Sequence, residues 1–235
     1  MALTAQDREQ QIKEAEELLF SGPQRLGFGN ALFFGHFQAP LIFPYPEIKP
    51  EERDAVRQAV DEVRRFCDER VDAAGIDRNA DIPQEVIAGL GQLGVLGMTA
   101  PREYDGRGFS QLGYTKIMEV LGGHDAGVAV FVNAHHSIGI RGLLLFGTEE
   151  QKQRWLPPLV RAEKIAAFAL TEPQAGSDAA NVQTVATPTP DGKTYVLNGE
   201  KRYITNGAIA QVLTVMARTP VPGSNETKVT AFIVT

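Results

Sequence analysis

The spacing of apolar residues predicts helices in the first two thirds of the chain. After Pro50, apolar side chains recur every three or four residues, as in a helix with one buried face. The expected buried positions of this helix are Val56, Ala59, Val60, Val63, Phe66 and Val71. The same criteria predict a helix capped by Asp81 with Pro83 in its first turn, helices over residues 111–121 and 126–146, and a short helix after a capping box of Thr148 and Gln151.

From about Lys164 onward, the pattern changes to short runs rich in β-branched residues. Asp-Gly and Asn-Gly pairs separate several of these runs, as hairpin turns do. The predicted strands cover residues 165–171, 182–186, 194–197, 203–205, 212–217 and 229–234. Because helices come first and strands second, we expect an α+β fold with an N-terminal all-helical domain followed by a partial antiparallel β-barrel or sandwich domain.

This pattern also predicts three regions along the chain. Residues 1–47 hold an amphipathic helix at 7–20 and a connector rich in glycine, proline and aromatic residues. Residues 48–164 form the helical domain, and residues 165–235 form an incomplete β domain. The sequence stops inside an apolar run, where a sheet would expose an unpaired edge. We therefore expect these residues to be the front part of a longer protein.

Composition narrows the class of protein. The 235 residues include 23 Lys and Arg against 29 Asp and Glu, a formal net charge of −6 without a basic block, which argues against a nucleic acid partner. The single cysteine, Cys67, excludes an internal disulfide and is expected to be a core thiol. The N-terminus lacks the layout of a signal peptide, and the apolar stretch 127–134 is too short to span a bilayer. We expect an intracellular, cytoplasmic protein.

Three potential site motifs lack the context that their chemistry needs. The glycines of 89–94 (GLGQLG) match a dinucleotide-binding pattern, but they follow a helix start and no strand precedes them, which favours a closely packed helix ending at Gly94. Ser177 lacks the G-x-S-x-G elbow of serine hydrolases. No metal site is expected, because adjacent helical residues point about 100° apart and no H-x-x-x-H or C-x-x-C spacing exists; the residues considered were His124, Asp125, His135 and His136.

Two segments carry candidate chemistry, 168–178 (FALTEPQAGSD) and 197–207 (LNGEKRYITNG). The first predicts a strand that ends in a loop containing hydroxyl groups and free backbone amides. In the second, Tyr203 and Thr205 are expected to share one face of a strand end while Ile204 points into the sheet. An aromatic ring beside a hydroxyl suits a flat heteroaromatic cofactor, although strand ends also carry these residues for turn chemistry alone.

The same two segments resemble the flavin-loop motifs of the acyl-CoA dehydrogenase family. The resemblance extends over most of the chain, and within the family the chain resembles the very-long-chain branch most. It includes the stretches 43–47 (FPYPE), 96–108 (LGMTAPREYDGRG), 134–139 (AHHSIG) and 146–152 (FGTEEQK). One departure stands out, because many relatives have Trp where this chain has Tyr203. A smaller ring with a hydroxyl is expected to alter flavin affinity or potential.

The resemblance implies FAD as the cofactor and assigns its contacts. The Leu170 amide and Thr171 would meet the pyrimidine side of the flavin ring, and the Thr205 hydroxyl would lie near N5. Ser177 would lie where the cofactor phosphate and the acyl-CoA substrate approach one another. The implied cofactor-binding residues are Phe168, Ala169, Leu170, Thr171, Gly176, Ser177, Tyr203, Ile204 and Thr205.

The family's activity is the α,β-dehydrogenation of fatty acyl-CoA thioesters in fatty acid β-oxidation. Its catalytic glutamate lies in a C-terminal helical domain that these residues do not reach, so no catalytic residue is expected here and the fragment alone should be inactive. Glu172 is expected to act only in loop hydrogen bonding.

The resemblance also implies partners and leaves alternatives open. It implies a long-chain acyl-CoA substrate, an electron-transfer flavoprotein as acceptor and a homo-oligomer when full length, with the mitochondrial matrix as the location in a eukaryote. A peripheral membrane contact stays open. A non-catalytic flavin-binding, acyl-CoA-binding or interaction module with the same scaffold remains an alternative, as does a flavin oxidase or monooxygenase.

Overall fold

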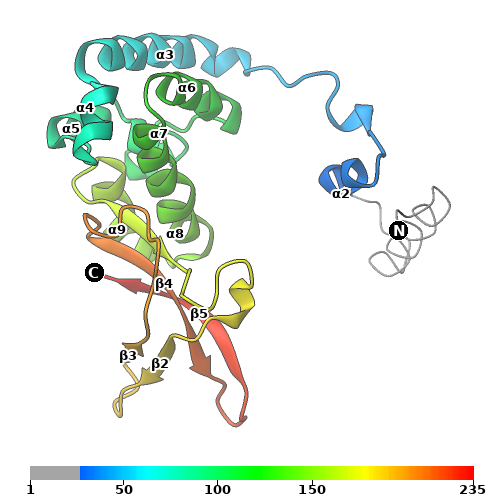
Figure 1. The fold of residues 1–235 in the computed structure, drawn as a ribbon, viewed down its shortest axis with the longest axis vertical. Coiled ribbons are helices and arrows are strands. Elements are labelled where there is room, and N and C mark those ends of the chain that lie inside the picture. Colours follow the sequence, from blue (N-terminus) through cyan, green and yellow to red (C-terminus); the bar gives the residue numbers. More distant parts are fainter. Residues whose placement is uncertain (1–26) are drawn as a thin grey trace, which may run out of the picture. The chain divides into compact units, whose positions relative to one another are not determined.

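A computed structural model describes residues 27–235, which belong to two compact units, Met1–Glu47 and Ile48–Thr235. The predicted helix at 7–20 lies outside the described residues. The described part of the first unit contains α2 (Phe28–Phe33) and a short 3₁₀ helix, η1 (Ala39–Leu41) (Figure 1). The predicted division of the second unit at residue 164 stays a prediction.

The buried positions in the helical part of the second unit follow the predicted apolar pattern. Figure 1 shows how these helices are arranged. Val56, Ala59 and Val63 of the first long helix are buried, as the spacing required. The helices are α3 (Pro50–Arg70), α4 (Ala73–Asn79), α5 (Gln84–Gln92), η2 (Val95–Gly97), η3 (Arg102–Tyr104), α6 (Gln111–His124), α7 (Ala126–Asn133), the π-helix η4 (Ala134–Ile140), α8 (Arg141–Phe146) and α9 (Glu149–Val160). The capping box of Thr148 and Gln151 is present at the start of α9.

Two details of the helix predictions are wrong. Asp81 does not cap α5, because the N-cap position is Pro83 and the helix begins one residue later. The sequence also did not predict α4, a short helix whose cap is Asp72 through a hydrogen bond from the Gly75 amide. A helix of this length contains too few apolar positions to show a period.

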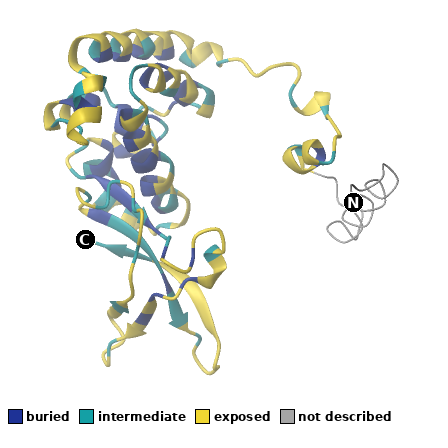
Figure 2. Cartoon of the chain, in the orientation of Figure 1, coloured by how far each residue is buried: buried dark blue, intermediate teal, exposed yellow. Residues whose placement is uncertain are grey.

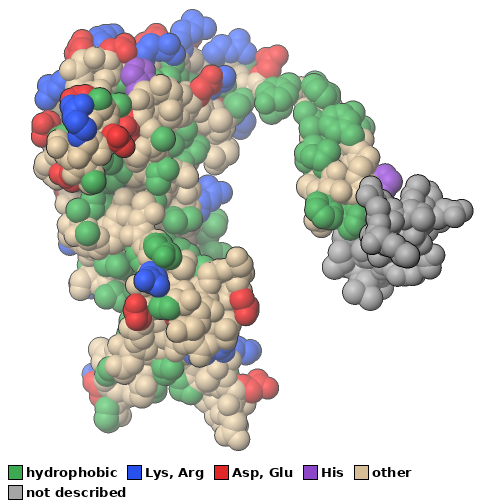
Figure 3. Space-filling view, viewed as in Figure 1, with side chains coloured by type: hydrophobic (Ala, Val, Ile, Leu, Met, Phe, Trp, Pro, Cys, Tyr) green, Lys and Arg blue, Asp and Glu red, His purple; other side chains and the backbone are tan. Residues whose placement is uncertain are grey.

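Side chains that face inward from these helices build one core. Figure 2 shows the buried residues on the inner sides of α3, α6 and α7, and Figure 3 shows charged side chains over the outer surface of α3, α4 and α5. The helix α5 packs closely through its glycines: a methyl group on Gly89 would collide with the Phe66 ring. Gly94 ends this segment in the left-handed conformation, with a φ of 66°. The glycine-rich stretch is therefore a packing element.

A five-stranded sheet follows the helices, with the order β1-β4-β2-β3 and β5 paired to β4. Its strands are β1 (Ala166–Ala169), β2 (Val185–Pro188), β3 (Tyr195–Asn198), β4 (Val212–Pro220) and β5 (Thr227–Val234), with the 3₁₀ helix η5 (Ala179–Asn181) before β2. The α+β prediction is confirmed, but the expectation of an antiparallel sheet is wrong because β4 runs parallel to both β1 and β2. The long connection from β1 to β4 lets the chain return in the same direction.

A second buried cluster joins the sheet to the helices. Ile140 and Leu143 of η4 and α8 pack with Leu159 of α9 and with Ala166 and Val212, which open β1 and β4. The close approach is tight, because a methyl group on Gly139 would lie 2.7 Å from the Ala166 Cβ. The start of β1 is therefore fixed by the helical layer beneath it.

Residues Ala126–Phe146 form a continuous apolar helix of 21 residues, long and apolar enough by length and composition to cross a membrane. In its most apolar window, 56% of the residues are buried inside the protein. The stretch 127–134 alone is too short to span a bilayer, but the helix that contains it is longer, so that argument does not apply to the whole helix. Packing against the sheet and the other helices accounts for the apolar residues on its buried side.

Two buried histidines lie in the π-helix of this segment. The Ala166 amide donates to His135 Nδ1 at 3.0 Å, so the Nε2 hydrogen is directed to the Leu159 carbonyl at 3.1 Å. The Thr99 amide donates to His136 Nε2 at 3.0 Å. Burial lowers the pKa of both histidines to about 4, assisted at His135 by the neighbouring His136 and at His136 by the charge of Arg141. Both are therefore neutral in the folded protein near pH 7.

These histidines should make the protein sensitive to acid. Between pH 6.5 and 4 the unfolded chain binds protons that the folded chain excludes, so the free energy of unfolding should fall as pH falls, by up to about 1.4 kcal/mol per pH unit for each histidine. The substitution His136→Gln keeps an acceptor for the Thr99 amide and removes one titrating group. Urea unfolding at a series of pH values should show a flatter acid dependence for this variant.

His124→Gln is the matched control. The Asp68 carboxylate lies 2.8 Å from His124 Nε2 and raises the pKa of this histidine, so its contribution is present below pH 6.5 and is lost only as pH rises. Its removal should leave the slope between pH 4 and 6.5 unchanged. An equal acid slope in the wild type and His136→Gln would contradict the assignment.

Candidate functional site

The first candidate segment leaves the sheet at the end of β1 and forms a tight loop. Reciprocal backbone hydrogen bonds between Glu172 and Ala175, at 3.0 and 3.2 Å, close this loop. Ala169 is buried, Phe168, Leu170 and Thr171 are half-buried, and Gly176 and Ser177 are exposed. We call residues 170–178 the first loop.

The second candidate segment is not a strand end, so the prediction for Tyr203–Thr205 is wrong. Tyr203 has a φ of 56° and Asn206 a φ of 64°, and the Gly207 amide donates to the Ile204 carbonyl at 2.9 Å to close a turn. The Asn-Gly pair imposes this turn before a strand can pair. We call residues 201–210 the second loop.

The side chains of the second loop nevertheless alternate in exposure. Tyr203 and Thr205 are exposed, whereas Ile204 is half-buried and lines a pocket. The prediction from strand geometry was that Ile204 faces inward and its two neighbours outward. Here the same difference in exposure occurs in a turn, in which Tyr203 and Asn206 are left-handed.

Direct hydrogen bonds bring the two loops together. The Arg202 amide donates to the Thr171 carbonyl at 2.9 Å, and Lys201 Nζ donates to the Leu170 carbonyl at 3.0 Å. Lys201 also forms an ion pair with Glu172 at 2.7 Å. The sequence analysis did not single out Lys201; its only signal was a lysine in one motif and a glutamate in the other.

Glu172 is a buried carboxylate with many donors around it. Only 4% of the residue is exposed, and its oxygens accept from the Thr184 amide at 2.9 Å, the Gln183 amide, the Thr184 hydroxyl and Lys201. Burial by itself would raise the pKa of Glu172, but these hydrogen bonds outweigh it and lower the pKa to about 2. The expected role of Glu172 in loop hydrogen bonding fits this geometry.

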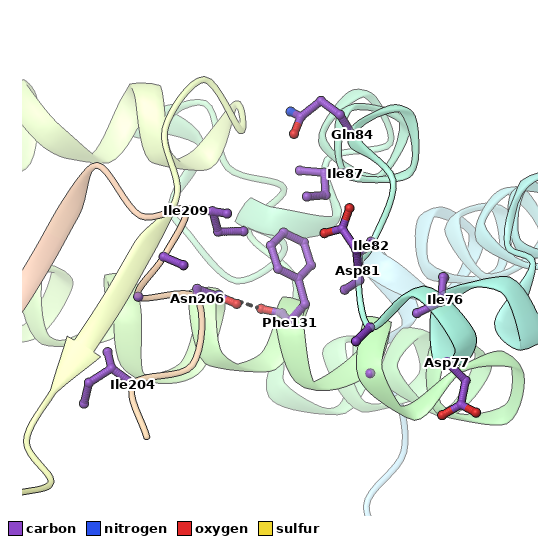
Figure 4. Close-up of a pocket in the computed structure, with 14 residues that line it drawn as sticks. Ile76, Asp77, Asp81, Ile82, Gln84, Ile87, Phe131, Ile204, Asn206 and Ile209 are labelled. Atoms are coloured by element: carbon purple, nitrogen blue, oxygen red, sulfur yellow. Dashed lines mark hydrogen bonds between the residues drawn. The ribbon is translucent and has the colours of Figure 1, made fainter. Parts of the chain in front are cut away.

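A pocket of about 590 Å³ lies on the inner side of the second loop (Figure 4). Figure 4 shows Asn206 and Ile209 on the side of Phe131 of α7, across from residues of α4 and α5, whereas the Ile204 side chain lies on the far side of the loop. Asn206 Nδ2 donates to the Phe131 carbonyl at 3.1 Å. The sequence analysis missed this wall of α4 and α5. Of the residues assigned to the cofactor, only Ile204 lines the pocket.

Three hydroxyl groups of the two loops are available to hydrogen-bond a ligand. Among the residues that the structure describes, the side chains of Thr171, Ser177 and Thr205 have no hydrogen-bond partner. Tyr203 is 83% exposed, although an exposed aromatic ring in a left-handed conformation gains nothing from folding alone. Gly176 has an ordinary φ and open space around it, so neither its turn nor its packing requires glycine. These features fit residues that contact a bound cofactor.

Metal chemistry gains no support from the described part of the chain, where no group of three or more His, Cys, Asp or Glu side chains could hold an ion. His124 contacts Asp68 and the Val120 carbonyl, while His135 and His136 bind backbone groups of the core. Cys67 is buried, and burial together with the Asp68 charge raises the pKa of its thiol to about 11. The two loops are thus the candidate site.

Sequence profiles of one protein family match both halves of the second unit. The profile described as "Acyl-CoA dehydrogenase, N-terminal domain" matches residues 51–163, and "Acyl-CoA dehydrogenase, middle domain" matches residues 167–235. The chain belongs to the acyl-CoA dehydrogenase family. The resemblance drawn from the two motif segments is confirmed.

Similar acyl-CoA dehydrogenases include proteins of the very-long-chain type. The human "Very long-chain specific acyl-CoA dehydrogenase, mitochondrial" is 42% identical over 212 residues, which cover 88% of this chain and 32% of that protein. The "Probable acyl-CoA dehydrogenase FadE10" of Mycobacterium tuberculosis is 39% identical over 236 residues and covers 100% of this chain and 36% of its own length. The chain therefore spans about a third of the length of these curated relatives.

A solved structure of the family supports the same fold. The crystal structure of an acyl-CoA dehydrogenase complexed with FAD from Bacillus anthracis superposes with a TM-score of 0.67 and 36% identity. The match covers 79% of this chain and 32% of that chain.

The geometry of the loops predicts a sharp contrast between two glycines. A methyl group on Gly199 would lie 2.7 Å from the Thr184 Cα and collide with its hydroxyl, which donates to Glu172. Gly199→Ala should therefore lower the free energy of unfolding by about 1–3 kcal/mol. Gly176→Ala, in open space, should change it by less than about 0.5 kcal/mol. Urea unfolding of both variants tests this, and equal losses would contradict the packing argument.

Proposed function

We propose that the complete protein containing this chain is an FAD-dependent acyl-CoA dehydrogenase that introduces an α,β double bond into fatty acyl-CoA thioesters in fatty acid β-oxidation. The observation that carries the proposal is the joining of the two motif loops by backbone and ion-pair contacts, with unpartnered hydroxyl groups on both. The similar B. anthracis dehydrogenase, solved with FAD, supports the choice of cofactor.

Each loop would supply one set of cofactor contacts. The first loop offers the Thr171 and Ser177 hydroxyls beside the backbone of Gly176, and the second offers the Tyr203 ring and the Thr205 hydroxyl. Bound FAD supplies the redox chemistry of the reaction by accepting a hydride from the substrate. The residues of the chain orient the ring, meet its polar edge and exclude water from one face. Ser177 would also contact the acyl-CoA.

Glu172 is unsuitable as the base that removes the substrate proton. A general base works best with a pKa near the operating pH, whereas the pKa of this carboxylate is held at about 2 and both oxygens are already hydrogen-bonded. We therefore assign no catalytic residue to this chain. The base is expected in a further helical domain, as in the family.

The partners belong to the same proposal. The 42% identity to very-long-chain dehydrogenases supports a long-chain acyl-CoA substrate. We propose an electron-transfer flavoprotein as the acceptor, as the resemblance to the family implies. We propose a homo-oligomer located in the cytoplasm, or in the mitochondrial matrix of a eukaryote.

A direct test uses the complete natural protein. Anaerobic addition of palmitoyl-CoA should bleach the flavin absorbance near 450 nm, and butyryl-CoA should do so more slowly. Oxygen consumption during turnover would instead indicate a flavin oxidase. A purified protein that binds no flavin would exclude the proposal.

Gly176→Ala tests whether the first loop contacts the cofactor. The added methyl group has open space in the described chain, so it should leave stability unchanged while blocking close approach of the ligand. The expected result is a rise of about tenfold in the FAD dissociation constant, equivalent to about 1.4 kcal/mol. An unchanged dissociation constant, measured by fluorescence titration of the apoprotein, would remove this residue from the site.

Thr205→Val tests the second loop. If its hydroxyl meets the edge of the flavin, loss of that hydrogen bond should slow flavin reduction about tenfold, the factor expected for about 1.4 kcal/mol. Thr205→Ser retains the hydroxyl and should react nearly as the wild type. Stopped-flow reduction of flavin-saturated proteins measures both, and equal rates in Thr205→Val and the wild type would contradict the assignment.

A further inference from the structure

We propose that Lys201 and Glu172 are positioning residues, whose ion pair sets the spacing between the two loops of the proposed flavin site without touching the cofactor. This inference rests on the proposed function and deepens it. The pair is nearly inaccessible, with 13% of the lysine side chain and 2% of the glutamate side chain exposed.

Hydrogen bonds and the ion pair join consecutive residues of the two loops. Lys201 Nζ holds the Leu170 carbonyl and the Glu172 carboxylate, and the Arg202 amide holds the Thr171 carbonyl between them. Three consecutive residues of the first loop are therefore bound by two consecutive residues of the second. Any change in the position of Lys201 must move all of these contacts together.

Glu172 also connects the two loops to a third segment of the chain. Its oxygens also accept from the Gln183 and Thr184 amides, in the segment that leads into β2. Arg218 of β4 fixes the same segment, since its amide donates to the Thr184 carbonyl and its guanidinium donates to the Val182 and Ala180 carbonyls. The carboxylate is thus anchored to the sheet, and the lysine transmits that position to the second loop.

The location of the pair indicates a role beyond stability. Leu170 and Thr171 directly precede Glu172, and Tyr203 follows Lys201 by two residues, so the candidate cofactor contacts flank the pair on both loops. By contrast, the ion pair of Lys152 and Glu149, at 3.0 Å, joins residues three apart in α9 and contacts neither of the two loops. A buried pair can often be replaced without loss of stability, so stability alone does not explain this one.

The test compares variants of the complete protein. Lys201→Met removes the charge and both hydrogen bonds while keeping the length of the side chain, and Lys201→Arg restores the charge. Lys152→Met is the matched control. Thr184→Val, which removes one donor to Glu172 and leaves the ion pair, serves as the milder variant if Lys201→Met does not fold.

Two readouts separate positioning from simple stability. Hydrogen exchange of the apoprotein should rise in peptides covering 170–184 and 200–205 in Lys201→Met, because the Arg202 and Thr184 amides lose their fixed acceptors. The FAD dissociation constant should rise at least about tenfold, as expected if the correct loop arrangement is populated only about a tenth of the time. The visible circular dichroism of the flavin should also change at saturating FAD.

The outcomes discriminate clearly. Lys201→Arg should bind FAD within about threefold of the wild type, Thr184→Val should weaken binding by about threefold, and Lys152→Met should match the wild type. A lower melting temperature in Lys201→Met with unchanged FAD affinity and flavin spectrum would overturn the positioning role and leave the proposed function intact. A wild-type protein that binds no FAD would overturn the proposed function, and this inference with it.

Discussion

The arrangement of the candidate site depends on one buried carboxylate. A carboxylate that is removed from water must be compensated by donors, and Glu172 finds them in two other segments of the chain, at Gln183 and Thr184 and at Lys201. This requirement holds the start of the first loop, the entry to β2 and the second loop close together. The loops owe their proximity to that demand for hydrogen bonds, because strand pairing ends before either of them begins.

The helical part of the protein supplies the fixed frame on which this arrangement stands. β1 starts from an amide bound to the buried ring of His135, and the absence of a side chain at Gly139 lets the π-helix approach the strand closely. At the other loop, Asn206 donates to the carbonyl of Phe131 in α7. A π-helix places its extra residue where an α-helix would not, and here it directs two successive histidines into the core. Residues of the continuous helix Ala126–Phe146 therefore contact both the strand that leads into the first loop and the second loop itself.

Periodicity and capping rules predicted most of the fold because they act locally. The apolar spacing in α3 and the capping box at Thr148 depend only on neighbouring residues, and both are confirmed. The parallel pairing of β4 with β1 and β2 depends on the path of the long connections between these strands. Rules that consider only neighbouring residues cannot predict that path. For the site, the motifs identified both loops. They did not indicate that Lys201 would join them, since a charged residue in a motif is usually solvated, and they placed Tyr203 on a strand that does not form.

The true conformation around Tyr203 makes a stronger argument for a ligand than the expected strand did. A strand would explain an exposed tyrosine by its alternation, but a non-glycine residue with a φ of 56° costs free energy and needs compensation. Burial provides none, since 83% of the residue is exposed, and the Arg202 guanidinium lies 5.4 Å from the ring centroid in a contact of small worth. The left-handed residues at 203 and 206 instead leave Thr205 exposed while Ile204 lines the pocket. A ligand that contacted the exposed ring of Tyr203 and the exposed hydroxyl of Thr205 would compensate this cost.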